Sequence, residues 1–324
     1  MSNGPVDLQR GVILDLDTLH PDDLDLSGLY SALADWTTHA RTAPAEMPVR
    51  LQSAQVAVTN KAVIDAQALA QARSLRLICI AATGTNNVDL AAAAARGIAV
   101  ANVTGYGTPS VVEHTFALIL ALRRRLAEHR QAATDRWRHQ PDFCVLDYPT
   151  AELAGKVLGI VGYGELGQAT AAVGRAFGME IVIARRPGGD DRSGRLPLDE
   201  LLRAADVVSL HCPLTAATRN LIGAAELALM KPDALLINTA RGGIVDEAAL
   251  LAALRAGRLG GAGLDVLVEE PPRHGNPLLE ADLPNLIVTP HIAWASREAR
   301  QRLVDGVAAN IRAFRAGEQR NRVC

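Results

Sequence analysis

A glycine-rich turn between an expected strand and an expected helix constrains the fold most. Gly162, Gly164 and Gly167 follow the apolar run ValLeuGlyIleVal at 157–161 and precede an alanine-rich stretch with helical periodicity. Glycines at this spacing permit a tight turn and let a pyrophosphate approach the backbone at the helix N-terminus. The alternative is a merely tight turn, but the flanking strand and helix and a second strand ending at residue 184 favour a dinucleotide-binding βαβ unit.

Short β-rich runs alternate with amphipathic helical stretches along the chain, which is typical of parallel sheets with crossover helices. Six strands are expected in the second half, at 157–161, 181–184, 207–210, 235–238, 262–265 and 286–289. Four more are expected at 12–16, 56–59, 77–81 and 98–102. The predicted fold class is α/β with two Rossmann-like domains, a doubly wound six-stranded parallel sheet and a smaller flavodoxin-like domain.

Two long helical patterns set the expected domain boundaries. The first covers about 110–129 and ends in the charged run ArgArgArgLeuAlaGluHisArg, which predicts a solvated helix end because basic residues suit a helix C-terminus. The second covers about 296–314 and is expected to return to the first sheet. The predicted domains are therefore a discontinuous one, 1–104 with 296–324, and a continuous one, 105–295.

Charge and apolar patterning exclude several partners. The 33 Lys and Arg residues nearly balance the 35 Asp and Glu residues, so no basic field is present to attract nucleic acid or an anionic membrane. No apolar run reaches the ~20 residues that span a bilayer, and the N-terminus lacks a secretory signal pattern. We expect a cytoplasmic protein that acts on a small molecule.

The four cysteines, Cys79, Cys144, Cys212 and Cys324, are scattered and have no metal-ligand spacing. This predicts reduced thiols and no metal site. Cys79 and Cys144 have the surroundings of small buried hydrophobes.

The end of the second strand bears on the choice of cofactor. A carboxylate that accepts hydrogen bonds from the adenosine ribose is usual there, ~20 residues past the glycines. This chain has Arg185 followed by Arg186, whose guanidinium groups suit a 2′-phosphate. The pair predicts a preference for NADP(H) over NAD(H); the alternative is two exposed loop arginines.

Three chemically capable side chains, Arg241, Glu270 and His291, each follow a different expected strand of the second domain. The carboxyl ends of these strands form the edge where a doubly wound sheet binds ligands, and the glycine turn lies at the same edge. Histidine transfers protons near neutral pH, glutamate orients its charged form, and arginine grips a carboxylate through two hydrogen bonds. The set predicts hydride transfer between a nicotinamide cofactor and a small 2-oxo or 2-hydroxy acid.

Each of these residues also has a plainer interpretation when taken singly. His291 could cap a loop, Arg241 could join a surface ion pair, and Glu270 before two prolines could be solvated. Their common edge favours the catalytic interpretation. His211 and His114 lack this support and are interpreted as structural or cofactor-adjacent.

Several motifs together resemble the D-isomer-specific 2-hydroxyacid dehydrogenases along essentially the whole chain. They are AlaThrGlyThrAsnAsnValAsp at 82–89, GlyTyrGlyGluLeuGly at 162–167, HisCysProLeuThr at 211–215, AsnThrAlaArgGlyGlyIleValAspGlu at 238–247 and ProHisIleAlaTrpAla at 290–295. The opening LeuAspLeuAspThrLeu and the AlaThrGlyThrAsnAsn form are most similar to the hydroxypyruvate reductase (glycerate dehydrogenase) branch.

The resemblance implies a role for each domain and for individual residues. The first domain binds substrate and the second binds NAD(P). Arg241 contacts the substrate, His291 transfers the proton and Glu270 pairs with it. The backbone of Thr83 and Gly84 holds the substrate carboxylate. Asn60 and Lys61 lie near the pocket wall. The implied cofactor-lining residues, with the glycine turn, are Thr108, Glu165, Leu166, Arg185, Cys212, Pro213, Thr218, Thr239, Ala240 and Asp265. Asn86 and Asn87 remain turn or cap residues.

The resemblance also implies a homodimer with an arm at about 110–148 that includes Trp137, against the alternative of a core tryptophan in a monomer. Glyoxylate reductase and D-lactate-type dehydrogenase are the nearest alternatives in function. A nucleotide-sensing corepressor is an alternative of a different class, which the retained arginine, glutamate and histidine disfavour.

Overall fold

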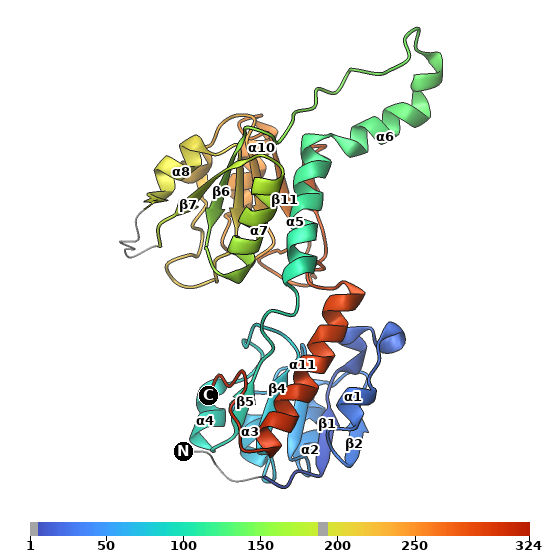
Figure 1. Ribbon diagram of the computed structural model, residues 1–324, viewed down its shortest axis with the longest axis vertical. Helices are drawn as coiled ribbons and strands as arrows, with labels where there is room; N and C mark the ends of the chain where they lie inside the picture. Colours follow the sequence, from blue (N-terminus) through green and yellow to red (C-terminus); the bar gives the residue numbers. More distant parts are fainter. Residues whose placement is uncertain (1–5, 187–193) are drawn as a thin grey trace. The chain divides into compact units, whose positions relative to one another are not determined.

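The computed structural model describes residues 6–186 and 194–324. The chain divides into two compact units, unit 1 from Met1–Gly107 with Ala295–Cys324, and unit 2 from Thr108–Trp294. Each unit contains its own parallel sheet with helices on both faces (Figure 1). No helix within the described ranges is long and apolar enough to cross a bilayer.

Unit 1 has a five-stranded sheet in the order β2-β1-β3-β4-β5. Its strands are β1 (Arg10–Ile13), β2 (Asp35–Thr38), β3 (Val56–Thr59), β4 (Leu77–Ile80) and β5 (Ala99–Ala101). This is the flavodoxin-like strand order, so the predicted class of the smaller domain is confirmed. The four expected strands are present, and β2 is an edge strand that the sequence did not suggest.

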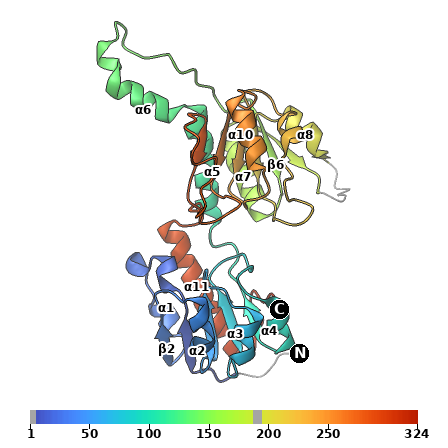
Figure 2. The same ribbon diagram turned by 180° about the vertical axis from the view of Figure 1, so that it is seen from behind.

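Helices cover both faces of the unit 1 sheet (Figure 2). The helices α2 (Met47–Leu51), α3 (Ala66–Gln71) and α4 (Leu90–Ala95) pack in one core with the strands. The helix α11 (Arg297–Arg315) contacts β4 and the short helix α1 (Ser27–Tyr30). The Ser296 side chain caps α11 by accepting a hydrogen bond from Ala299 N, and Leu303, Val307 and Ile311 are buried. The expected final helix therefore covers the first sheet.

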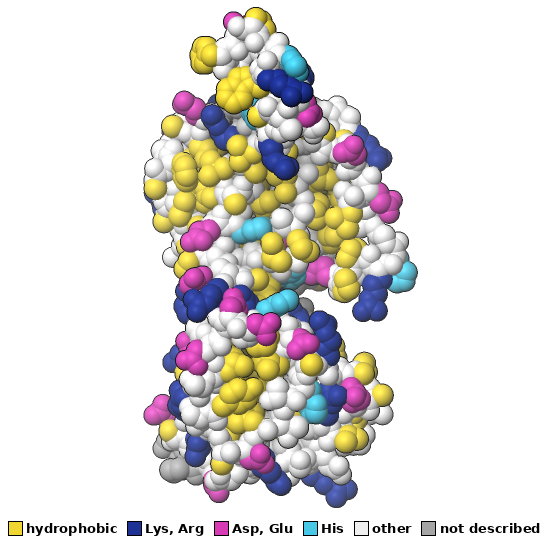
Figure 3. Space-filling view, turned by 90° about the vertical axis from the view of Figure 1, so that its right-hand side faces the viewer, with side chains coloured by type: hydrophobic (Ala, Val, Ile, Leu, Met, Phe, Trp, Pro, Cys, Tyr) yellow, Lys and Arg dark blue, Asp and Glu magenta, His cyan; other side chains and the backbone are white. Residues whose placement is uncertain are grey.

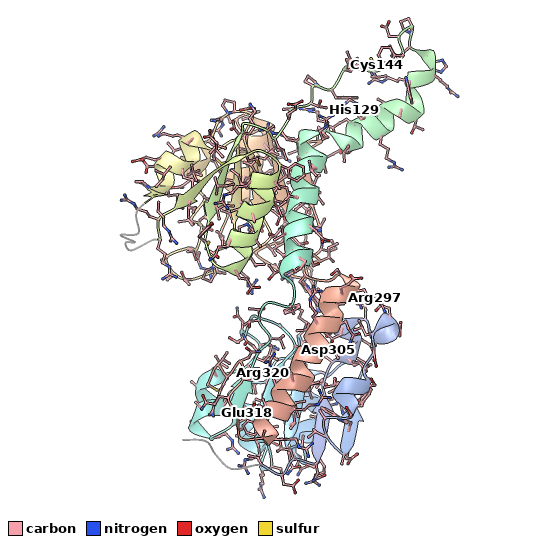
Figure 4. The ribbon with its side chains drawn as sticks, viewed as in Figure 1. His129, Cys144, Arg297, Asp305, Glu318 and Arg320 are labelled. Atoms are coloured by element: carbon pink, nitrogen blue, oxygen red, sulfur yellow. The ribbon has the colours of Figure 1, made fainter. Side chains whose placement is uncertain are left out.

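The described part of unit 1 also contains three short 3-10 helices, η1 (Leu16–Leu19), η2 (Pro21–Asp23) and η3 (Pro44–Glu46). Arg297 and Asp305 lie on α11, and Glu318 and Arg320 lie beyond its end (Figure 4). The Arg297 Nε donates to the carbonyl of Asp23 at 2.9 Å, which ties the start of α11 to η2.

Unit 2 has a seven-stranded parallel sheet in the order β12-β11-β10-β9-β6-β7-β8. Its strands are β6 (Val157–Val161), β7 (Glu180–Ala184), β8 (Arg195–Leu196), β9 (Val207–Leu210), β10 (Leu235–Asn238), β11 (Gly261–Leu264) and β12 (Leu286–Val288). All six expected strands are present. The additional strand, β8, pairs with the end of β7 at the sheet edge.

Two separate cores show that the unit 2 sheet is doubly wound. The helices α5 (Thr108–Arg123) and α7 (Glu165–Ala176) pack against one face. The helices α8 (Leu198–Ala204), α9 (Ala224–Leu227) and α10 (Glu247–Arg255) pack against the other. Crossovers on both faces leave the carboxyl ends of the strands open for ligands.

The single helix expected over 110–129 is wrong, because the chain breaks after α5. Arg125 adopts a left-handed conformation (φ 47°), and a second helix, α6 (Leu126–Asp135), starts directly after it. The segment then passes through η4 (Trp137–His139), and α6 projects away from the sheet of unit 2 (Figure 1). A left-handed residue ends a helix because it turns the backbone out of the hydrogen-bond pattern.

Two local expectations fail at single residues, although Arg124 and Arg130 of the charged run are exposed as predicted. Arg123 is buried rather than solvated, because its guanidinium donates to the carbonyls of Asp233 and Asp206 at 3.1 and 3.5 Å. Cys144 is half-buried beside an almost fully exposed Phe143. Cys79 is fully buried in β4 as expected, and burial raises the pKa of its thiol.

Candidate active site

The glycine turn connects β6 to α7. Gly162 has φ 98°, and a Cβ there would lie 2.6 Å from the backbone of His211 and Cys212. A Cβ on Gly167 would lie 2.1 Å from the Gly162 carbonyl oxygen. At Gly164, the N-cap of α7, a Cβ would meet no described atom within 4 Å. The turn is tight on its inner side and open at the helix N-terminus, where the amide groups and the dipole favour a pyrophosphate.

Arg185 follows β7 directly and is held by β8. Its backbone N donates to the Leu196 carbonyl at 2.8 Å, and its Nε donates to the Arg195 carbonyl at 3.0 Å. Arg185 and Arg186 are exposed. The short edge strand β8 therefore orients one guanidinium at the end of β7.

The segment after β9 is a rigid turn. Thr218 is buried, and its hydroxyl donates to the Pro213 carbonyl at 2.6 Å. His211 Nε2 lies 2.9 Å from the Ser209 hydroxyl, and burial lowers the pKa of His211 to about 4. Burial also raises the pKa of the Cys212 thiol. The imidazole of His211 and the thiol of Cys212 are therefore uncharged near neutral pH. The part of the turn that these two residues form carries no charge.

Arg241 lies in the turn after β10 and is exposed. The Asn238 side chain fixes this turn, because its Nδ2 donates to the Arg241 carbonyl at 2.9 Å and its Oδ1 accepts from Ala240 N at 3.0 Å. The Arg241 Nη1 donates to the Ala240 carbonyl at 2.7 Å. Thr239 and Ala240 are buried beneath it.

A close backbone contact joins the Arg241 turn to the segment that precedes Glu270. A Cβ on Gly242 would lie 1.7 Å from the Leu267 carbonyl oxygen, so only glycine fits there. Leu267 N in turn donates to Glu270 Oε1 at 2.8 Å. Two of the predicted catalytic residues are thus carried by segments in direct contact.

The structure brings Glu270 and His291 together. His291 Nδ1 lies 2.6 Å from Glu270 Oε2, and each side chain is 33% exposed. One oxygen of Glu270 contacts His291 Nδ1, and the other accepts a hydrogen bond from Leu267 N. The carboxylate is therefore held in place, and it fixes the orientation of the imidazole. Nε2 is then the ring nitrogen that can exchange a proton with a bound molecule.

Asp265 organises the segment that carries His291. It follows β11 and is almost fully buried. Its Oδ1 accepts from Ile292 N at 2.9 Å and from the Thr289 hydroxyl at 2.6 Å, and its Oδ2 accepts from Ala293 N at 2.8 Å. His114 on α5 lies 2.9 Å from the same hydroxyl, which gives it a structural contact. His291 itself is held in the left-handed region with φ 55°.

The remaining predicted residues of unit 2 lie near the glycine turn. Thr108 starts α5, and its hydroxyl donates to Glu165 Oε1 at 2.5 Å. Leu166 follows in the first turn of α7. These positions lie at the N-terminus of α7, whose amide groups and dipole suit the pyrophosphate of a dinucleotide.

In unit 1 the predicted substrate-binding residues lie at the carboxyl ends of β3 and β4. The Thr83 hydroxyl donates to the Val103 carbonyl at 2.9 Å, and the Asn102 side chain donates to the Thr83 carbonyl at 2.7 Å. Within the described residues, the N–H groups of Thr83 and Gly84 donate no backbone hydrogen bond. Such N–H groups suit an anionic ligand.

Sequence reasoning missed three supporting residues, Asp15, Asn238 and Thr289, and interpreted Asn87 only as a turn or cap residue. Asp15 and Asn87 hold the loop of Asn60 and Lys61 through backbone hydrogen bonds. Asn238 and Thr289 fix the loops of Arg241 and His291. Asp15, Asn238 and Thr289 share one signal, a polar residue at or within two residues of the carboxyl end of a strand, whereas Asn87 precedes α4 and has no such signal.

The two parallel sheets and the open glycine turn define a dinucleotide-binding α/β protein. Comparisons with known proteins support this class. Residues 116–293 match the model of the D-isomer specific 2-hydroxyacid dehydrogenase, NAD binding domain. The chain is 48% identical over 279 residues to a glycerate dehydrogenase of Methylorubrum extorquens, which covers 86% of this chain and 88% of that protein.

Two further similarities extend over almost the whole chain. A hydroxypyruvate reductase of Blautia hydrogenotrophica is 38% identical, covering 96% of this chain and 98% of that protein. A crystal structure of a protein from Thermus thermophilus has a TM-score of 0.82 at 36% identity, covering 98% and 100% of the two chains. The chain belongs to the D-isomer specific 2-hydroxyacid dehydrogenase family, and it is an oxidoreductase with an NAD-binding domain.

Proposed function

We propose that the protein is a hydroxypyruvate reductase, or glycerate dehydrogenase, that transfers hydride between NAD(P)H and the C2 position of the acid. The observation that carries the proposal is the pair of His291 Nδ1 and Glu270 Oε2 at 2.6 Å, at the sheet edge that also carries Arg241 and the glycine turn. Two relatives named for this chemistry, at 48% and 38% identity, support the choice of substrate.

Each member of the catalytic set has a separate task in the proposal. The nicotinamide supplies hydride to the carbonyl carbon when it is bound. His291 Nε2 supplies the proton to the carbonyl oxygen, and Glu270 stabilises and orients the imidazolium. Arg241 binds the substrate carboxylate through its guanidinium. In the reverse direction His291 accepts the hydroxyl proton.

Substrate recognition is completed by unit 1. The proposed ligands of the substrate carboxylate there are the N–H groups of Thr83 and Gly84, with Asn60 and Lys61 at the pocket wall. Unit 1 is accordingly the proposed substrate-binding domain, and unit 2 is the NAD(P)-binding domain. The cofactor is proposed to lie along the glycine turn, Thr108, Glu165, Leu166, Cys212, Pro213, Thr218, Thr239, Ala240 and Asp265. Cytoplasmic location stays a prediction.

The test is reduction of hydroxypyruvate by purified protein with NADPH or NADH, followed by loss of nicotinamide absorbance. We expect saturable turnover and a D-glycerate product. Glyoxylate and pyruvate, assayed in parallel, distinguish the glyoxylate reductase and D-lactate dehydrogenase alternatives by their kcat/KM. Cofactor binding without turnover of any 2-oxo acid would favour the corepressor alternative.

The cofactor preference leads to a prediction on Arg185 and Arg186. Replacing both with alanine is expected to raise the KM of NADPH by roughly 10- to 100-fold, because charge-assisted hydrogen bonds to the 2′-phosphate are lost. The KM of NADH should change little. The matched control is Arg203→Ala, an exposed arginine of α8. A wild-type enzyme that prefers NADH would contradict the proposed preference for NADP(H).

We propose that α5, α6 and the segment to about residue 148 form a homodimerisation arm. Several large apolar side chains are exposed there: Leu126, Trp137, Phe143 and Leu146. Figure 3 shows hydrophobic side chains gathered on the face of unit 2 on the side of α5. His129 on α6 lies 3.2 Å from the Tyr148 carbonyl, which links α6 to the returning segment containing Cys144 (Figure 4).

If this arm joins two copies of the chain, substitutions in it should change the oligomeric state. Phe143 and Leu146 are 90% and 80% exposed, more than a monomer usually leaves on one short segment. Replacing both with aspartate is expected to convert a dimer into a monomer, measured by light scattering after size exclusion. Val49→Asp, at an exposed apolar position of unit 1, is the control and should leave the mass unchanged. A monomeric wild type would refute the arm.

A further inference from the structure

One buried carboxylate holds the loop that carries Asn60 and Lys61. Asp15 follows β1 and is 4% exposed. Three consecutive N–H groups donate to its carboxylate: Asn60 N to Oδ1 at 2.9 Å, and Lys61 N and Ala62 N to Oδ2 at 2.6 and 2.7 Å. A single side chain therefore fixes the backbone of the whole loop at 60–62.

A carboxylate suits this position better than any neutral side chain. Burying a charge is costly unless hydrogen bonds replace its hydration, and here three backbone donors do so. Hydrogen bonds to an ionised acceptor are shorter and stronger than neutral ones. The 2.6 and 2.7 Å distances to Lys61 N and Ala62 N agree with that class.

The other contacts of the loop each reach one group or a carbonyl, and the shortest to the backbone is the Thr59 hydroxyl, which donates to the Ala62 carbonyl at 2.8 Å. Asn87 Nδ2 lies 3.4 Å from the Asn60 carbonyl and 3.2 Å from the Ala62 carbonyl. The Asn60 Nδ2 donates to the Ala81 carbonyl at 2.7 Å, so the Asn60 side chain is aligned with the end of β4. Asp15 differs from these contacts because one side chain accepts from three consecutive backbone amides of the loop.

We propose that Asp15 is a positioning residue for substrate recognition. It sets the backbone at 60–62 so that the exposed Lys61 is presented to the 2-oxo acid and the buried Asn60 is held at the end of β4. The inference rests on the proposed function, because it takes these two residues as substrate-binding. Asp15 does not contact substrate itself and acts through the loop.

The test is Asp15→Asn, which keeps the shape but removes one acceptor oxygen and the charge. We expect the KM of hydroxypyruvate to rise by about 10-fold, as for the loss of charge-assisted hydrogen bonds, with kcat within about 3-fold of wild type. The KM of the cofactor should not change, because the loop belongs to unit 1. Hydrogen exchange of the Lys61 and Ala62 amides should become faster in the variant.

Asp206→Asn is the matched control. Asp206 is also a buried carboxylate that accepts from a backbone amide, Val157 N at 2.8 Å, but it lies at the amino end of β9, away from the ligand edge. Its replacement should lower the melting temperature without raising the KM of hydroxypyruvate. If Asp15→Asn does not fold, Asp15→Ser offers a smaller acceptor for the same measurements.

An unchanged KM of hydroxypyruvate in a folded Asp15 variant would overturn the inference, whether or not its melting temperature falls as in Asp206→Asn. A wild-type enzyme that turns over no 2-oxo acid would instead refute the proposed function. Hydrogen exchange at 60–62 distinguishes the two failures, since it reports the loop whatever the substrate.

Discussion

Replacing His291 with alanine is expected to lower kcat by roughly 10²- to 10⁴-fold, the usual contribution of a positioned proton donor. The KM of the cofactor should remain near wild type, because the glycine turn does not depend on the imidazole. His291→Asn is the sharper variant, since asparagine tolerates the left-handed backbone that this position requires. Steady-state kinetics with hydroxypyruvate measures both effects.

A second histidine supplies the control. His274 Nδ1 lies 2.8 Å from Glu269 Oε1, so it forms a pair of the same type on a neighbouring segment, but it is 85% exposed. His274→Ala should leave kcat unchanged. Full turnover by both His291 variants would remove His291 from catalysis.

The second large effect is expected for Arg241→Lys, which should lower kcat/KM for hydroxypyruvate by roughly 10²-fold. Lysine keeps the charge but cannot offer two parallel hydrogen bonds to a carboxylate. The loss should appear in kcat/KM for 2-oxo acids. The affinity for the cofactor should not change, and it is measured by fluorescence quenching in the absence of substrate.

Arg258→Lys is the matched control for this variant. Arg258 is exposed just beyond α10, before β11 begins, and so lies away from the ligand edge. It should keep wild-type kinetics. An Arg241→Lys enzyme with unchanged kcat/KM would show that the substrate carboxylate is bound elsewhere.

The sequence predicted elements that have a strong apolar signal. All ten expected strands are present, because buried parallel strands read as continuous apolar runs. The missed strands β2 and β8 are edge strands. β2 consists of AspTrpThrThr with mostly exposed side chains, and β8 has two residues, so neither leaves an apolar run.

Features that depend on tertiary contacts could not be predicted. Arg125 adopts a left-handed conformation, and a glycine or asparagine at this position would have indicated the helix end in the sequence. Arg123 is buried because two carbonyls at the amino edge of the sheet accept hydrogen bonds from it. The pairing of Glu270 with His291 was predicted from their common edge, and the structure places the two side chains in contact. The support from Asp15 depends on which loop crosses the end of β1, which sequence spacing does not reveal.

The discontinuity of unit 1 affects how the chain is made. Unit 2 is one continuous segment, whereas the sheet of unit 1 receives α11, which follows unit 2 in the sequence. Domains usually fold as units during synthesis, starting with the N-terminal one. Here α11 follows unit 2 in the sequence, so the sheet face that Leu303, Val307 and Ile311 cover stays open until the whole of unit 2 has been synthesised. An apolar face of the unit 1 sheet therefore stays uncovered while unit 2 is being made, and exposed apolar surface of this kind makes a nascent chain prone to aggregation.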